Sequence, residues 1–312
     1  MLNKRVIIDW LKNNAPHKLI QRRWYYHSYF KKSCEIINGK EPKEFEIYTV
    51  AFNNDRVIDY QIKLMKKNFK DEHQHVVVDN SSDEEISKKI REICIDNDTM
   101  YIRLPKNTLF SSQSHALALN YIYRNIILKR ENVRYFWFLD HDIFPIKETT
   151  ILSYIKKQKM YGYLMDKERI KYARNAWNLR PGFCFFDKSM SRKFDFRPTK
   201  SLFPLYALDT WGKNYKLIYK KYDKNKLQFP FKELFWVHKD FSEENIEYSK
   251  VADYLLAIEY SQKKHFVYTY EYIKDKERIH RWWTYFFWTD ELAYKKYLNL
   301  INLFFDKLDK FL

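Results

Sequence analysis

The stretch RYFWFLDHDIFP (Arg134–Pro145) decides the fold of this chain. Its residues Tyr135–Leu139 are apolar or aromatic without interruption, as expected for a strand that is buried on both faces. Such strands occur mainly in parallel sheets that helices cover on both sides. Asp140-His141-Asp142 follows at once, so two carboxylates stand where the strand ends. Residues 134–139 are therefore predicted to form a central strand of a parallel sheet.

Three runs upstream also have the composition of strands, with β-branched and aromatic residues bounded by polar ones. They are Phe45–Phe52, His75–Asn80 and Met100–Leu104. Between and after them, apolar residues recur at helical spacing. The predicted helices cover Val57–Phe69, Ser82–Cys94 and Ser114–Arg130. This alternation predicts an α/β fold with a Rossmann-type, mostly parallel sheet flanked by helices.

Ligands of such sheets bind beyond the carboxyl ends of the strands. The loops that leave the four predicted strands there are all polar: Asn53–Asp55, Asp79–Ser82, Pro105–Asn107 and Asp140–Asp142. A second Asp-x-Asp match, Asp96–Asp98, precedes its strand and is predicted to be a turn at the opposite edge. Asp140 and Asp142 are thus the pair at the predicted site, with a solvated turn as the alternative.

Glycine is scarce, with only four residues, at positions 39, 162, 182 and 212. Glycine-rich phosphate loops need glycines about three to five positions apart. P-loop NTPases, ordinary protein kinases and ordinary Rossmann dehydrogenases are therefore poor interpretations. Carboxylates can instead hold Mg²⁺ or Mn²⁺, which neutralises the phosphates of a nucleotide. The sequence favours a divalent metal, held by Asp140 and Asp142, over a phosphate loop.

The chain has 312 residues and a net charge of +17. This charge suits nucleic acid, an anionic membrane surface, or acidic sugars and nucleotide diphosphates. The lysines are spread along the chain, so nucleic acid is not expected as a partner. Three widely spaced cysteines fit a reducing compartment, and no apolar run suits a signal peptide or a membrane span. We expect a cytoplasmic protein, with a peripheral position at the inner face of a membrane as the alternative.

The remaining elements are less regular. A helix is predicted near Thr149–Lys157, strands near Met160–Met165 and Phe183–Phe186, and a helix near Val251–Lys264. An amphipathic C-terminal helix follows the aromatic run Trp282–Trp288. Its apolar face consists of Leu298, Ile301, Phe304, Phe305 and Leu308. This helix suits either a peripheral membrane contact or packing on the sheet.

Three segments together resemble the GT-A-fold glycosyltransferases, nearest to the family 2-like enzymes of bacteria and large DNA viruses. They are TVAFNN (Thr49–Asn54), VVVDNSSDEE (Val76–Glu85) and FLDHDIFP (Phe138–Pro145). The resemblance implies a GT-A-like fold and a hexosyltransferase-type enzyme. It would use Mn²⁺ or Mg²⁺ to move a sugar from a nucleotide-diphosphate sugar to a glycan or glycolipid acceptor. Its parts would be a helical preface (1–43), a catalytic domain (44–245, divided at 145 into nucleotide and acceptor halves) and a helical C-terminal extension (246–312).

The resemblance also implies roles for individual residues of the nucleotide half. Asn53 and Asn54 would line the nucleoside pocket, and Asp79 would hydrogen-bond the base. Turn chemistry is the alternative for these three, because Asn and Asp favour such loops. The residues that would contact the nucleotide from the predicted helix are Ser114, His115 and Asn120. His115 fits an ordinary helix-start residue equally well. Asp140 would bind ribose and metal, and Asp142 metal.

In the acceptor half, Arg180 and Gly182 would close over the donor sugar, and His238 would be a late metal ligand. Asp209 is the candidate general base, with Asp187 and Asp240 as rivals and a helix N-cap as its alternative role. A retaining mechanism would not need that base. Two other functions stay open: nucleotidyl transfer with a carboxylate-held metal, and a non-enzymatic basic protein that binds nucleic acid or a membrane surface.

Overall fold

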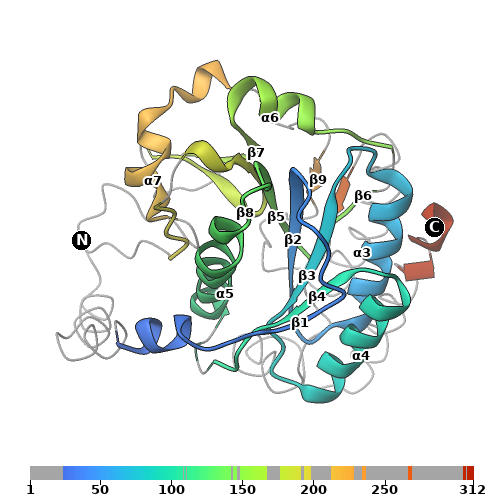
Figure 1. Ribbon diagram of the computed structural model, residues 1–312. Coiled ribbons are helices and arrows are strands. Elements are labelled where there is room, and N and C mark those ends of the chain that lie inside the picture. Colours follow the sequence, from blue (N-terminus) through green and yellow to red (C-terminus); the bar gives the residue numbers. More distant parts are fainter. Residues whose placement is uncertain are drawn as a thin grey trace, which may run out of the picture.

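The computed structural model describes residues 24–107, 109, 111–141, 143–145, 148–166, 176–190, 193–197, 212–227, 234–236, 266–268, 305–306 and 308–312. Within them, seven strands form one sheet in the order β1-β4-β3-β2-β5-β8-β7 (Figure 1). Its four central strands are mutually parallel: β4 (Met100–Arg103), β3 (Gln74–Asp79), β2 (Phe45–Ala51) and β5 (Tyr135–Asp140). The predicted α/β fold with a mostly parallel sheet is confirmed.

Helices cover both faces of this sheet. Helices α3 (Asp55–Asn68) and α4 (Glu84–Asp96) lie on one side and α5 (Ser111–Asn125) on the other (Figure 1). Alternate residues of β3 serve the two faces, because strand side chains point in opposite directions in turn. Val77 packs in the cluster with Ile58 of α3, whereas Val76 packs in the cluster with Ile122 of α5. The uninterrupted apolar strands thus have a partner on each side.

Antiparallel strands complete both edges of the sheet. Strand β8 (Asn178–Asp187) pairs with β5, and β7 (Met160–Met165) pairs with β8, after the short helix α6 (Leu152–Gln158). These elements lie where they were predicted. Strand β1 (Glu35–Ile37) pairs with β4, inside the segment predicted to be wholly helical, although residues 24–30 are a helix. The prediction missed β1, which is too short to show periodicity and gains its hydrogen bonds from the edge of β4.

A second, three-stranded sheet forms from the chain that directly follows Asp140–Asp142. Strand β6 (Ile143–Pro145) pairs with β10 (Phe266–Tyr268), which pairs in turn with β9 (Leu234–Trp236). Residues far apart in sequence therefore meet beside the end of β5. The helix predicted near Val251–Lys264 lies outside the described residues.

Short helical elements complete the described chain. The helix α7 covers Asn214–Leu217. The 3₁₀ turns are Ile127–Lys129, Lys188–Met190, Tyr219–Lys221, Lys224–Lys226 and Asp309–Phe311. The Lys224 ammonium lies 2.6 Å from a carboxylate oxygen of buried Asp166, which joins the region after α7 to the end of β7.

The last described segment packs on the protein. Phe305 and Leu308 are buried in a cluster with Val57 of α3 and Phe144 of β6. The Arg56 guanidinium lies 4.1 Å from the centre of the Phe305 ring. Of the two predicted roles of this helix, Phe305 and Leu308 therefore show packing on the protein. They pack against α3 and β6, not against the seven-stranded sheet. Residues 282–304 lie outside the described part. None of the described helices is long and apolar enough to cross a membrane.

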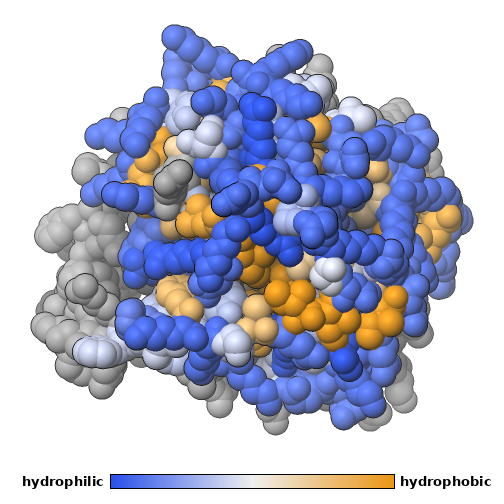
Figure 2. All heavy atoms as spheres, in the orientation of Figure 1, coloured by the Kyte–Doolittle hydropathy of each residue, from blue (hydrophilic) through white to orange (hydrophobic). Residues whose placement is uncertain are grey.

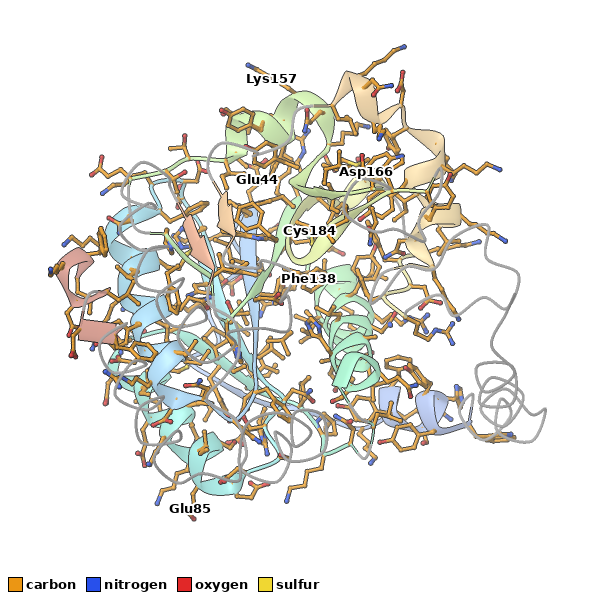
Figure 3. The ribbon with its side chains drawn as sticks, turned by 180° about the vertical axis from the view of Figure 1, so that it is seen from behind. Glu44, Glu85, Phe138, Lys157, Asp166 and Cys184 are labelled. Carbon is orange, nitrogen blue, oxygen red and sulfur yellow. The ribbon has the colours of Figure 1, made fainter. Side chains whose placement is uncertain are left out.

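Aromatic residues form much of the interior, while hydrophilic side chains dominate the face in Figure 2, where an apolar band interrupts them. The rings of Trp137 and Phe185 stack with centroids 4.0 Å apart across β5 and β8. Phe138 and Cys184 are paired residues of the same two strands and lie inside the molecule (Figure 3). All three cysteines are free thiols. Most of the aromatic side chains that the structure describes therefore belong to the core.

One buried ion pair lies near the start of β2. Glu46 is fully buried and pairs with the guanidinium of Arg130, while Tyr48 donates a hydrogen bond to it. Burial raises the pKa of the Glu46 carboxyl, and the Tyr48 and Arg130 contacts oppose that rise. The Lys188 ammonium holds the same region by donating to the Arg130 carbonyl over 2.6 Å.

Replacing Arg130 with Met should lower the free energy of unfolding by about 3–5 kcal/mol at pH 7, because it leaves a buried carboxylate unpaired. An unpaired buried carboxyl has a higher pKa folded than unfolded, so folding takes up a proton. The deficit should therefore shrink as the pH falls from 7 toward about 5. Urea unfolding at both pH values measures it. The double variant Arg130→Met/Glu46→Gln should recover part of the loss; a deficit that is independent of pH would contradict this account.

Candidate functional site

The connections between the parallel strands change direction across the sheet between β2 and β5. From β2 the chain proceeds through α3 to β3 on one side, and it returns through α5 to β5 on the other. Ligands of open α/β sheets bind at such a switch point, beyond the carboxyl ends of the strands. Val50 pairs with Asp140 in this register. The loops after β2 and β5 therefore leave the sheet side by side at this edge.

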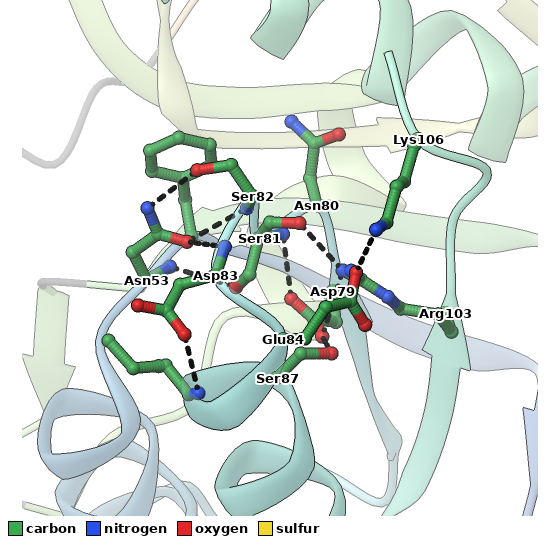
Figure 4. A network of polar contacts seen from close by, with 12 residues as sticks. Asn53, Asp79, Asn80, Ser81, Ser82, Asp83, Glu84, Ser87, Arg103 and Lys106 are labelled. Carbon is green, nitrogen blue, oxygen red and sulfur yellow. Dashed lines mark hydrogen bonds and ion pairs between the residues drawn. The ribbon is translucent and has the colours of Figure 1, made fainter.

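Asp79, the last residue of β3, is the centre of a buried polar network (Figure 4). One of its oxygens accepts from the Ser81 amide at 2.8 Å. The other accepts from Ser87 and from Tyr101 at 2.8 Å, and lies 3.2 Å from the Arg103 guanidinium. Burial and the Asp79 charge raise the pKa of Tyr101, so its hydroxyl stays a donor. With 0% exposure, Asp79 would have to give up one of these partners to hydrogen-bond a base.

Asn53 joins the loop after β2 to the start of α4. Its backbone is left-handed, with φ 47°, and its side-chain oxygen accepts from the amides of Ser82 and Asp83 at 2.8 and 3.1 Å. Its side-chain amide donates to Ser82 Oγ at 2.8 Å (Figure 4). Asn54 caps α3 by accepting from the Val57 amide at 3.1 Å. Both residues show the turn chemistry that was the alternative to nucleoside contact.

The next loop connects this network to α5. The Asn80 side chain donates to Ser114 Oγ at 3.0 Å and accepts from Asn107 at 2.9 Å. Ser114 lies in the first turn of α5, and the following residue, His115, places Nε2 3.9 Å from Asp140 Oδ1. Three contacts, Asn53–Ser82, Asn80–Ser114 and His115–Asp140, are joined by short stretches of chain. Together they form a line of contacts from Asn53 to Asp140.

Asp140 completes that line at the end of β5. Its side chain is 22% exposed, and that of His115 is 28% exposed, so both reach the surface at the switch point. Gly182 of β8 lies directly against the carboxylate, with φ 83°, and a Cβ at this position would overlap all three carboxylate atoms. Only glycine leaves room for Asp140 here. Gly182 was predicted to approach a ligand closely, and its nearest neighbour is Asp140 itself.

Two buried side chains hold the loop that follows. Gln61 of α3 donates to the carbonyls of Asp140 and Ile143, at 2.7 and 2.9 Å. His141 is 3% exposed, and its Nδ1 accepts from the Phe52 amide at 3.3 Å. The middle residue of Asp140-His141-Asp142 thus points into the protein and ties β5 to β2.

The structure separates two candidates from this site. Asn120 is buried in α5 and bonds the Ala116 carbonyl at 2.7 Å and the Phe196 amide at 3.4 Å, so it holds the 194–196 segment. The predicted nucleotide contact of Asn120 is not supported by these bonds. Asp187 pairs in register with Tyr135, at the amino end of β5, and so lies at the opposite edge from Asp140. That position argues against Asp187 as the general base.

Other candidates lie where the structure gives no side chain. Asp142, Asp209, Asp240 and His238 are outside the described residues. Arg180 belongs to β8, but its side chain is outside the described set. The Asp96–Asp98 match is the C-terminal turn of α4, as predicted.

Metal binding depends on which donor atoms the described residues bring together. Among them no group of three or more His, Cys, Asp or Glu side chains is placed to hold a metal ion. They do supply a partly exposed carboxylate and an imidazole 3.9 Å apart, Asp140 and His115. Carboxylate oxygen is the preferred ligand of Mg²⁺ and suits Mn²⁺. The described donors supply part of such a ligand set, and Asp142 lies outside the described residues.

No protein-family model matches the sequence, and no curated protein matches it. Among solved structures, the chain is similar to a Pyrobaculum calidifontis mannosyltransferase in complex with GDP-Man and Mn²⁺ (11% identity, 61% of this chain, 57% of that chain, TM-score 0.33). It is also similar to S. aureus TarS 1-349 in complex with UDP-GlcNAc (21%, 39%, 34%, 0.28) and to the S. cerevisiae mannosyltransferase Ktr4p (9%, 56%, 66%, 0.33). The chain spans less than two thirds of each. Similarity at this level leaves reaction and substrate to be argued from the site.

Replacing Gly182 with Ala should lower the free energy of unfolding by about 2–5 kcal/mol, through left-handed backbone strain and overlap with the Asp140 carboxylate. Gly39→Ala is the matched control, because its Cβ would meet Ile36 at an ordinary 3.6 Å. Adding Asp140→Ala to Gly182→Ala should restore part of the loss, about 1–3 kcal/mol. Denaturant unfolding of these three variants and of Asp140→Ala alone measures this; strictly additive losses of the two single variants would show that residues 140 and 182 do not touch.

Proposed function

We propose that the protein is a metal-dependent glycosyltransferase that moves a sugar from a nucleotide-diphosphate sugar to a glycan or lipid-linked acceptor. One observation carries the proposal: the Asp140 carboxylate stands at the switch point of a mostly parallel sheet, between His115 and Gly182. The scarcity of glycine supports it, because a metal takes the place of a glycine-rich phosphate loop.

In this proposal Asp140, Asp142 and His238 hold Mn²⁺ or Mg²⁺. When bound, the metal would neutralise the charge of the departing nucleoside diphosphate. The register of the small sheet supports the inclusion of His238. Trp236, the last residue of β9, stands level with Tyr268 of β10 and through it with Ile143 of β6. The strand before His238 therefore ends two strand spacings, about 10 Å, from the residue that follows Asp142.

The nucleotide would lie along the line of contacts from Asn53 to Asp140. Asn53, Asn54 and Asp79 hold the loops of the nucleoside side in place through the bonds described above. Ser114 and His115, at the start of α5, face the same edge and would contact the nucleotide near the metal. Arg180 and Gly182 belong to β8, which lies next to β5 on the side away from β2, and the donor sugar would bind there.

The acceptor side of the proposal rests on the sequence. Asp209 would take the proton from the attacking acceptor hydroxyl if the enzyme inverts the anomeric configuration. The proposed limits of the catalytic domain remain 44–245, although β1 extends its sheet from the preceding segment. A membrane contact through residues 282–304 remains a prediction and would suit a lipid-linked acceptor.

A thermal-shift panel of nucleoside diphosphates and nucleotide sugars, with and without Mn²⁺, tests the proposal. A ligand at 100 times its dissociation constant adds about 2.7 kcal/mol, or roughly 4 °C for a protein of this size. Asp140→Asn and Asp142→Asn should abolish the metal-dependent shift. Asp98→Asn alters the other Asp-x-Asp match, at the opposite edge, and should leave the shift unchanged.

The products separate the proposal from its rivals. Release of nucleoside diphosphate from a nucleotide sugar supports glycosyl transfer, whereas release of pyrophosphate would indicate nucleotidyl transfer. If no nucleotide gives a Mn²⁺-dependent shift, the glycosyltransferase proposal is wrong. Salt-dependent binding to DNA or vesicles that Asp142→Asn leaves intact would then favour a basic binding protein.

A further inference from the structure

We propose that Gln61 is a positioning residue that fixes the metal-binding loop Asp140–Ile143 from within the protein. The inference rests on the proposed function and deepens it. Gln61 lies in the middle of α3 and is 0% exposed, so it touches no ligand itself. A polar side chain completely inside the apolar face of a helix needs partners for its donors and acceptor.

The two hydrogens of the Gln61 amide bond the two ends of the loop. Nε2 donates to the Asp140 carbonyl at 2.7 Å and to the Ile143 carbonyl at 2.9 Å. Only His141 and Asp142 lie between these carbonyls in sequence. The backbone is therefore held immediately before and after the segment that carries the second carboxylate. Movement of either end would leave a buried N–H unpaired, which is costly.

A third hydrogen bond sets the orientation of the Gln61 amide. Its Oε1 accepts from Thr49 Oγ1 of β2 at 2.8 Å. The Thr49 hydroxyl has a single hydrogen, so its 2.9 Å contact with His75 Nε2 requires the imidazole to be the donor. Desolvation lowers the pKa of His75 to about 3, so the ring is neutral at physiological pH. A directed chain from His75 through Thr49 thus keeps the Gln61 oxygen away from the loop and both hydrogens toward it.

These hydrogen bonds matter because metal ligands must be held to within about 0.5 Å of the geometry in which they bind the metal. Residues that orient ligands from behind typically change metal affinity by about 10–100-fold when they are replaced. His141 adds a third fixed point through its bond with the Phe52 amide. The loop is thereby attached to α3 and to β2 before any metal is bound.

The chain contains a matched control for a merely structural role. Asn68 lies seven residues after Gln61 on α3, is 6% exposed, and donates its side-chain amide to the Pro145 carbonyl at 2.8 Å. Both residues therefore make the same kind of bond from the same helix to the chain that follows Asp140. Only Gln61 bonds the two ends of the Asp140–Ile143 loop.

The test compares full-length Gln61→Leu and Asn68→Leu with wild type. Titration with Mn²⁺, followed by electron paramagnetic resonance of the free ion, should show about 10–100-fold weaker binding in Gln61→Leu. Asn68→Leu should bind Mn²⁺ within about twofold of wild type, although it too loses a buried hydrogen bond. Gln61→Met replaces Gln61→Leu if the latter does not fold. Equal weakening in both variants would overturn the positioning role.

Hydrogen exchange gives a readout that needs no metal. Amides of residues 140–143 and of Phe52 should exchange faster in Gln61→Leu than in wild type, and at the wild-type rate in Asn68→Leu. Unchanged exchange at 140–143 in Gln61→Leu would overturn the inference whatever the metal result. A wild-type protein that binds no Mn²⁺ would overturn the proposed function instead, and the exchange data would still decide whether Gln61 holds the loop.

Discussion

The close approach of the Asp140 carboxylate to the Gly182 backbone is the contact on which the site depends. Strand β5 is apolar to its last residue but one and needs cover on both faces, which places it at the centre of the sheet. The first polar side chain after that run emerges at the carboxyl edge, beside β2. Strand β8 pairs antiparallel with β5. Glycine at position 182, directly against Asp140, leaves room for the carboxylate there.

The polar residues around this edge divide into two kinds. Asp79, Asn53 and His141 are almost fully buried, and their known bonds go to backbone amides and neighbouring side chains. Asp140 and His115 keep part of their surface in solvent. The buried group holds the loops rigidly, and the exposed pair is left to meet a ligand. Preorganisation of this kind is what metal-assisted transfer requires.

Much of the first half could be predicted, because its elements are long and strongly periodic. Strands β2 to β5 and helices α3 to α5 lie within a few residues of their predicted positions. Strand β1 has three residues and shows no period. Gln61 had a visible signal, a polar residue at helical spacing within the apolar stripe of Ile58 and Met65, and such a residue must find buried partners. The bonds of Asn120 with Ala116 and Phe196 could not be predicted, because sequence order does not show which way a helix face points.

The sequence by itself determined the α/β class and the position of Asp140 at the carboxyl end of a central strand. These follow from local periodicity and from a general rule about parallel sheets. Only the tertiary structure decided that Asp79 is enclosed by four donors, that Asp187 lies at the opposite edge, and that Gln61 reaches the loop after β5. Tyr101 and Arg103 follow Asp79 by more than twenty positions, and Gln61 precedes Asp140 by 79, so only packing brings these partners within hydrogen-bond distance.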